Sequence, residues 1–152
     1  MELVLFCGIQ ATGKSSFFKE RFSDTHVRIN LDMLRTRNRE QRMFDLCLEL
    51  QQPCVIDNTN PAAADRARYI GPARQAEFRV VGYYFESKIA SAIERNNLRG
   101  DAAIPERGVL ATYNKLELPS IDEGFEKLNF VRITDTGFEV SPWLETEVEN
   151  EV

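Results

Sequence analysis

Two glycines, a lysine and two serines follow an apolar run near the start of the chain, in the segment GIQATGKSS at residues 8–16. Their spacing satisfies the pattern G-x-x-x-x-G-K-[S/T], which wraps phosphate groups when it lies between a strand and a helix. Glycines let backbone amides converge on phosphate oxygens, the lysine neutralises the β- and γ-phosphates, and the first serine holds Mg²⁺. The residues expected to bind the nucleotide are Gly8, Gly13, Lys14, Ser15 and Ser16. The sequence therefore predicts a site for ATP and Mg²⁺, with a glycine turn and an incidental lysine as the alternative.

A carboxylate and a guanidinium come next, in the stretch INLDMLR. Asp32 lies just past the end of an expected strand, at the sheet edge where ligands gather in open parallel sheets. A carboxylate at this position can accept the proton of an attacking hydroxyl, and Arg35, three residues further on, can hold an anionic part of the acceptor. The alternative role for Asp32 is the N-cap of the following helix, and the two roles can coexist.

A second acidic residue ends another apolar run, in VIDNTN. Asp57 resembles the aspartate that supports Mg²⁺ in nucleotide-binding proteins. It could instead line the acceptor pocket, or form an Asx turn before a helix.

Two arginines stand four residues apart in ERNNLRG, beside a glycine. Arg95 and Arg99 would share one helix face, and on a mobile cover they could clamp the phosphoryl group during transfer. The alternative is a pair of surface arginines.

Apolar runs alternate with amphipathic stretches along the whole chain, which predicts an α/β fold with a parallel sheet covered on both faces. We expect a helix break near Gly71–Pro72. Expected strands are 3–8, 26–30, 54–58, 78–86 and 130–134; expected helices are 13–22, 32–51, 61–76, 88–100 and a stretch after Pro105.

Composition places the chain among ordinary globular proteins, with 152 residues, 43% hydrophobic and 28% charged. The net charge of −5 comes entirely from residues 139–152, which carry five glutamates and no lysine or arginine. With the phosphate loop and Asp32 in the first part of the chain, we expect a P-loop kinase domain over 1–138 and an acidic C-terminal tail over 139–152.

Three cysteines and one histidine leave little room for a zinc site, a histidine triad or a disulfide framework. The sequence shows no membrane-spanning run and no signal peptide, so a cytoplasmic protein without membrane partners is expected.

Beyond the phosphate loop, several motifs give the chain a family resemblance. INLDMLR, IDNTNP, AADRARY, RNNLRG and the later EGF resemble the P-loop 5′-hydroxyl polynucleotide kinases, such as that of phage T4, and more broadly the zeta-toxin-like AAA-type small kinases. The resemblance spans roughly residues 3–134. It implies a P-loop NTPase fold of the nucleoside-kinase type with a small helical lid.

The resemblance also implies roles for individual residues. Asp32 would be the general base on a nucleic acid 5′-hydroxyl, and Arg35 would contact the neighbouring phosphate of the acceptor. Lys14 and Ser15 would bind ATP phosphates and magnesium. The lid arginine at the donor phosphates would be Arg99 with Arg95, and the acceptor pocket would be shaped by Asp57 and Asn58.

Two departures from the family pattern keep other functions open. Leu31 stands where these kinases have an arginine before the general base, and no D-x-D-G-T signature occurs, so no phosphatase domain is expected in the chain. The alternatives are a small-molecule kinase for a nucleoside, sugar or antibiotic, a nucleotide-binding ATPase without a hydroxyl acceptor, and a non-catalytic module.

Overall fold

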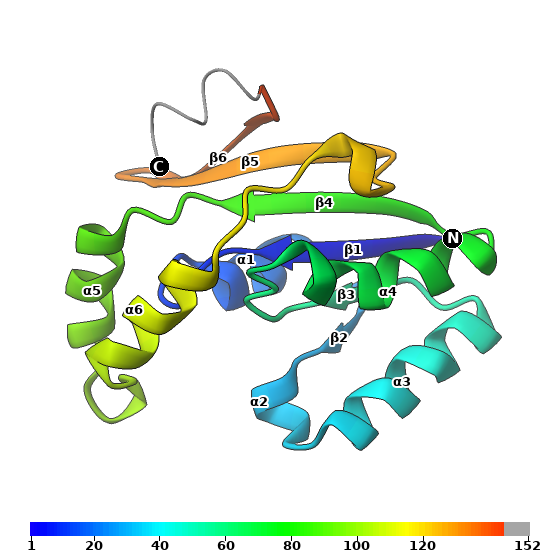
Figure 1. Ribbon diagram of the computed structural model, residues 1–152, viewed down its shortest axis with the longest axis horizontal. Coiled ribbons are helices and arrows are strands. Elements are labelled where there is room, and N and C mark those ends of the chain that lie inside the picture. Colours follow the sequence, from blue (N-terminus) through cyan, green and yellow to red (C-terminus); the bar gives the residue numbers. More distant parts are fainter. Residues whose placement is uncertain (145–152) are drawn as a thin grey trace.

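Six strands form one sheet in the computed structural model, which describes residues 1–144 (Figure 1). They are β1 Glu2–Cys7, β2 Val27–Ile29, β3 Cys54–Ile56, β4 Arg79–Phe85, β5 Lys127–Thr134 and β6 Gly137–Pro142. Across the sheet their order is β2-β3-β1-β4-β5-β6. β1 to β5 are all parallel, and β6 pairs antiparallel with β5. The predicted parallel sheet is confirmed, and the strand order reverses direction around β1, where ligands bind in such sheets.

Helices cover both faces of the sheet, because the side chains of β1 point alternately to opposite sides. Leu3 and Leu5 pack against α3 and α4, whereas Val4 and Phe6 pack against α1. The helices are α1 Lys14–Arg21, α2 Leu31–Leu34, α3 Arg37–Leu50, α4 Ala63–Gln75, α5 Ile89–Asn97 and α6 Glu106–Lys115, with 3₁₀ turns η1 Gly100–Ala102 and η2 Ile121–Glu123.

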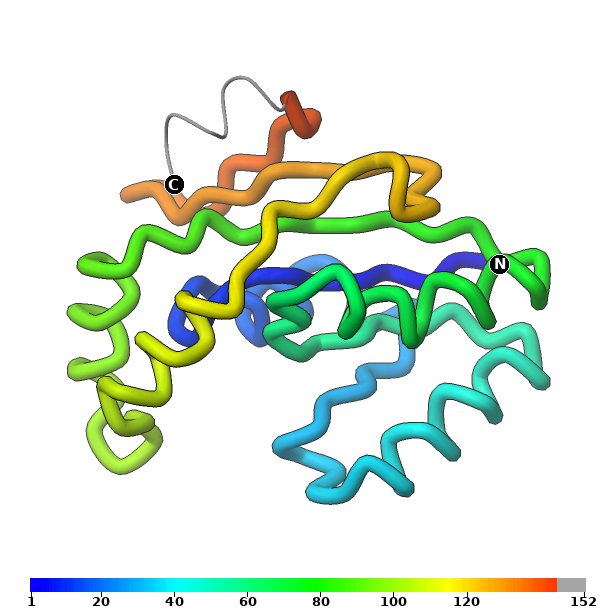
Figure 2. The backbone as a smooth tube through the Cα atoms, viewed as in Figure 1, coloured from blue at the N-terminus to red at the C-terminus, as the bar shows by residue number. Residues whose placement is uncertain are grey.

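α5 and α6 lie side by side beyond one end of the sheet, as the backbone trace shows in green and yellow (Figure 2). Ala92 of α5 and Val109 of α6 pack against Ile9 in the phosphate loop. The small helical lid is thus joined to the loop through an apolar contact. Within residues 1–144, no helix has the length and apolar character needed to cross a membrane.

The expected helix over 32–51 is two helices. Arg35 ends α2 with a φ of 74°, and Thr36 then caps α3 by accepting a hydrogen bond from the amide of Arg39. A residue with positive φ cannot continue an α-helix, so the chain turns at this point. The prediction of one continuous helix was wrong.

The expected break at Gly71–Pro72 was also wrong, because Pro72 lies inside α4. Both residues face solvent, and α4 ends only three residues after the proline. Proline removes one helical hydrogen bond, a small loss this close to the helix end. The carbonyl of Pro72 still accepts a bond from the amide of Ala76.

The sheet extends into the segment that we expected to be an acidic tail. Residues 139–142 belong to β6, and the Trp143 ring packs edge-on against Tyr84, with 5.2 Å between ring centroids. The rest of the expected tail, 145–152, lies outside the described residues.

Candidate active site

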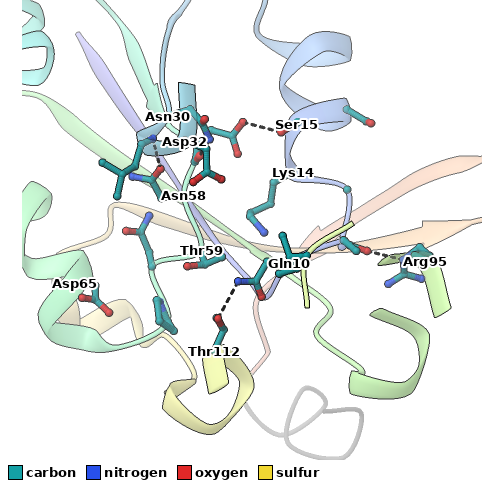
Figure 3. A pocket seen from close by; sticks show the side chains of 18 of the residues that line it. Gln10, Lys14, Ser15, Asn30, Asp32, Asn58, Thr59, Asp65, Arg95 and Thr112 are labelled. Atoms are coloured by element: carbon teal, nitrogen blue, oxygen red, sulfur yellow. Dashed lines mark hydrogen bonds between the residues drawn. The ribbon is translucent and has the colours of Figure 1, made fainter. Parts of the chain in front are cut away.

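A cavity of about 780 Å³ opens at the carboxyl ends of β1, β2 and β3 (Figure 3). The segments that follow these strands line it, at residues 10–16, 30–32 and 57–61. The lid closes one side through α5 and α6, and the N-terminal halves of α3 and α4 close another. The sheet therefore brings together most of the residues that the sequence singled out.

Backbone geometry of the phosphate loop requires both of its glycines. A β-carbon on Gly8 would lie 2.9 Å from the β-carbon of Phe85, so the loop could not approach β4 as closely. Gly13 has a φ of 95° and precedes α1, with no side chain to cap the helix. The first amides of α1 are consequently left for an anion, as in phosphate sites at helix N-termini.

Lys14 points into the hollow of the loop and donates hydrogen bonds to the carbonyl oxygens of Gly8 (2.9 Å) and Ile9 (2.7 Å). Burial lowers the pKa of Lys14 to about 8, while Asp57 and Asp32 oppose this shift. A polyanion in the loop would restore the full charge of the ammonium, because nearby negative charge favours the protonated form.

Ser15 and Asp57 face each other at the edge of the cavity, with the serine hydroxyl donating to the carboxylate across 3.3 Å. Hard oxygen ligands of this kind suit Mg²⁺, which usually takes one or two protein ligands and keeps phosphates and waters for the rest. No group of three acidic, cysteine or histidine side chains that could hold a metal occurs among residues 1–144. The pair fits a magnesium ion that arrives with a nucleotide.

Asp32 lies in the first turn of α2 and lines the same cavity as Lys14 (Figure 3). It is not the N-cap of its helix: Asn30 is, because its side chain accepts a hydrogen bond from the amide of Met33 (2.8 Å). Asn30 also donates to the carbonyl oxygen of Asp57 (2.6 Å), which ties β2 to β3. The carboxylate of Asp32 is therefore exposed and left for chemistry.

Asn58 fixes the backbone that carries Asp32. Its side-chain oxygen accepts a hydrogen bond from the amide of Leu31 (2.8 Å), and its amide group donates to Glu40 (2.6 Å). Glu40 is 1% exposed and also accepts hydrogen bonds from Tyr69 (2.8 Å) and Arg37 (2.9 Å). No local pattern indicates a role for Glu40, since its position in α3 resembles a solvated helix face.

The lid is tied to the phosphate loop by polar contacts. Arg95 donates to the carbonyl oxygen of Ala11 (2.6 Å), and Gln10 donates to the hydroxyl of Thr112 in α6 (2.9 Å). Arg99 lines the cavity beside Arg95. Both predicted lid arginines therefore reach the site.

Two predicted site residues do not line the cavity. Gly8 lies behind the loop, where its role is close packing. Arg35 ends α2 with an exposed side chain, and basic residues from other elements line the cavity instead. Those that sequence reasoning missed are Arg37, Arg68 and Lys115.

The β5–β6 hairpin closes the side of the cavity next to α1. Ile133 and Phe138 line it there, and a β-carbon on Gly13 would lie 2.7 Å from the Phe138 ring. Sequence reasoning missed both residues, because nothing local places the end of the chain beside its first loop.

Residues 3–119 match the family described as AAA domain. A curated relative is the bifunctional polynucleotide phosphatase/kinase of Schizosaccharomyces pombe, 25% identical over 135 residues. The alignment covers 86% of this chain, and the chain spans a third of the length of that relative.

Solved structures share the fold. One is Kti12 of Chaetomium thermophilum in complex with ADP-AlF3, with a TM-score of 0.67, 12% identity, and 98% of this chain and 94% of that chain covered. Another is a gluconokinase of Sinorhizobium meliloti, with a TM-score of 0.62, 15% identity, and 99% and 88% covered. The resemblance inferred from the motifs is confirmed: the chain belongs to the AAA domain family, as a P-loop kinase domain homologous to those of polynucleotide phosphatase/kinases.

Proposed function

We propose that this protein transfers the γ-phosphoryl group of ATP to a hydroxyl group, and that the hydroxyl is the 5′-end of a nucleic acid. The observation that carries the proposal is the presence of Lys14 and Asp32 in the lining of one cavity. A cradle for the donor and a free carboxylate for the acceptor are the two parts that such a transfer needs.

In the proposed reaction, the acceptor oxygen bonds to the γ-phosphorus, the bond to the β-phosphate oxygen breaks, and ADP leaves. Asp32 receives the hydroxyl proton. Lys14 and Arg99 neutralise the charge on the phosphates, which is the main contribution of protein side chains to phosphoryl transfer. Ser15 and Asp57 would hold Mg²⁺, which adds charge neutralisation when bound.

The charge of the acceptor side supports a phosphate-bearing substrate. Arg37 from α3, Arg68 from α4 and Lys115 from α6 line the cavity, on elements other than the phosphate loop and α1. Arginine and lysine there would bind the phosphate next to a 5′-hydroxyl. The S. pombe relative, named a polynucleotide phosphatase/kinase, is consistent with that acceptor.

A small-molecule hydroxyl is the second proposed acceptor, favoured by one observation. Leu31, not an arginine, lines the cavity next to the proposed base, so one basic contact to a nucleic acid strand is missing.

The test is transfer of radiolabelled phosphate from ATP to a 5′-hydroxyl oligonucleotide, compared with a panel of nucleosides, sugars and antibiotics. Asp32→Asn should reduce transfer by about 10²-fold or more while ATP binding is retained, as expected for loss of a general base. Asp24→Asn, at an exposed turn, is the matched control. Transfer to metabolites alone would refute the nucleic acid acceptor, and full transfer by Asp32→Asn would refute the proposed base.

A further inference from the structure

Arg28, which has no role in the proposed reaction, lies against Ser15 and Asp57, the two residues that would hold Mg²⁺. Arg28 in β2 donates from Nε to Oδ2 of Asp57 (2.8 Å) and from Nη2 to the hydroxyl of Ser15 (2.9 Å). Its guanidinium thus bridges the two side chains that would hold Mg²⁺.

The buried carboxylate explains why a cation is needed at this place. Asp57 is 1% exposed, and an unpaired charge at that depth is strongly unfavourable. Arg28 supplies the opposite charge, with its Nε 2.8 Å from Oδ2 of Asp57. The serine hydroxyl is engaged as well, because it donates to Asp57 and accepts from Arg28.

A divalent cation at the same oxygens would meet the positive charge of Arg28 at close range. We propose that Arg28 and the divalent cation are alternative occupants of the gap between Ser15 and Asp57, and that Arg28 withdraws when the metal binds with the nucleotide. This inference rests on the proposed function, since it assumes that nucleotide and metal bind at this site.

The surroundings of Arg28 would allow its side chain to move into solvent. β2 is an edge strand of the sheet, and the Arg28 side chain is 25% exposed. Its remaining contacts are weak: Nη1 lies 3.9 Å from the sulfur of Met33, and the guanidinium carbon lies 6.0 Å from the centre of the Phe18 ring. Among residues 1–144, only the bonds to Ser15 and Asp57 hold the guanidinium strongly, and the metal would take over both partners.

The experiment measures the coupling between metal and nucleotide. The dissociation constant of a fluorescent, non-hydrolysable ATP analogue is determined with Mn²⁺ and with EDTA. The value in EDTA divided by the value with Mn²⁺ is the coupling, so a larger coupling means that the metal strengthens nucleotide binding more. Wild-type protein is compared with Arg28→Gln. Arg21→Gln, in the neighbouring α1, removes the same charge away from Ser15 and Asp57 and serves as the control.

Arg28→Gln should raise the coupling by about tenfold or more, because the metal no longer displaces a bound cation. Arg21→Gln should leave it unchanged. Should Arg28→Gln fail to fold, Arg28→Met is measured in its place; it also removes the positive charge, so a rise of about tenfold is again expected.

Unchanged or reduced coupling in the measured Arg28 variant would overturn the inference and leave the proposed function standing, because arginine and metal would then bind side by side. Absence of nucleotide binding in every protein, wild type included, would overturn the inference and the proposed function together.

Discussion

Binding of ATP should be accompanied by uptake of a proton at Lys14. In the free protein, burial lowers the pKa of this lysine to about 8, so that near this pH the ammonium is present in only part of the molecules. The phosphates of a bound nucleotide favour the charged form and raise the pKa again. We therefore expect ATP binding to depend on pH in the range around 8.

The size of the effect follows from the position of that pKa. A group with a pKa near 8 is unprotonated in about a tenth of molecules at pH 7, in about half at pH 8 and in about nine tenths at pH 9. If the bound state is fully protonated, these fractions equal the protons taken up per ATP. The affinity for ATP should fall about tenfold between pH 7 and pH 9, because the fraction of molecules already protonated at Lys14 falls from about nine tenths to about one tenth.

Isothermal titration calorimetry measures this uptake directly. The apparent binding enthalpy is determined at each pH in two buffers with different protonation enthalpies, and its dependence on the buffer gives the number of protons. Lys14→Arg is the control, because a guanidinium keeps its charge throughout this range. Cys7, with a pKa raised by burial to about 11, and Tyr69, at about 12 for the same reason, do not titrate here.

Equal proton uptake by wild type and Lys14→Arg at pH 8 would show that a group other than Lys14 takes up the proton. Affinity independent of pH between 7 and 9 would likewise refute proton uptake at Lys14.

Three further substitutions test the support of the site and of the sheet. Glu40→Gln should lower the rate of phosphoryl transfer about tenfold with little change in ATP affinity, because Glu40 holds Asn58 and thereby α2; a rate equal to that of wild type would show that Asn58 is held in other ways. Arg66→Met should reduce the free energy of unfolding by about 3–5 kcal/mol in urea denaturation, since it leaves Glu123 without the two hydrogen bonds that the fully buried guanidinium donates; a loss below 1 kcal/mol, the typical value of an exposed pair, would contradict this. Trp143→Ala should reduce the same quantity by about 2–3 kcal/mol through lost packing on β4 and β5; an unchanged urea midpoint would mean that the end of β6 adds nothing to the fold.

Local patterns in the sequence were enough to predict the donor side of the site. The glycines and the lysine of the phosphate loop are adjacent in the chain, and Asp32 and Asp57 each follow a strand whose end is marked by a change from apolar to polar residues. Parallel strands end at one edge of the sheet, so these carboxylates had to come together.

The basic residues on the proposed acceptor side could not be predicted, because their positions depend on how α3 and α4 pack on the sheet. Arg37 and Arg68 reach the cavity because α3 and α4 are turned towards it by their packing on Leu3 and Leu5. Arg35 was the expected contact, but the positive φ that ends α2 gives its side chain another direction. The break of a helix at one backbone angle thus changes which arginine lines the cavity.

The last strand escaped prediction because of its composition. β6 is an edge strand, and its residues are mostly exposed or half-exposed, with glycine at one end and proline at the other. Such a segment lacks the apolar run that indicates a buried strand. Its pairing with β5 becomes evident only in three dimensions.

The contact between Phe138 and Gly13 brings the end of the described chain against the phosphate loop near its start. A shortened version ending before residue 137 would lack this ring and would leave the phosphate loop without its outer wall. Recombinant versions for crystallisation or screening should accordingly retain the whole of β6, and a purification tag is better attached beyond residue 144 than spliced into the hairpin.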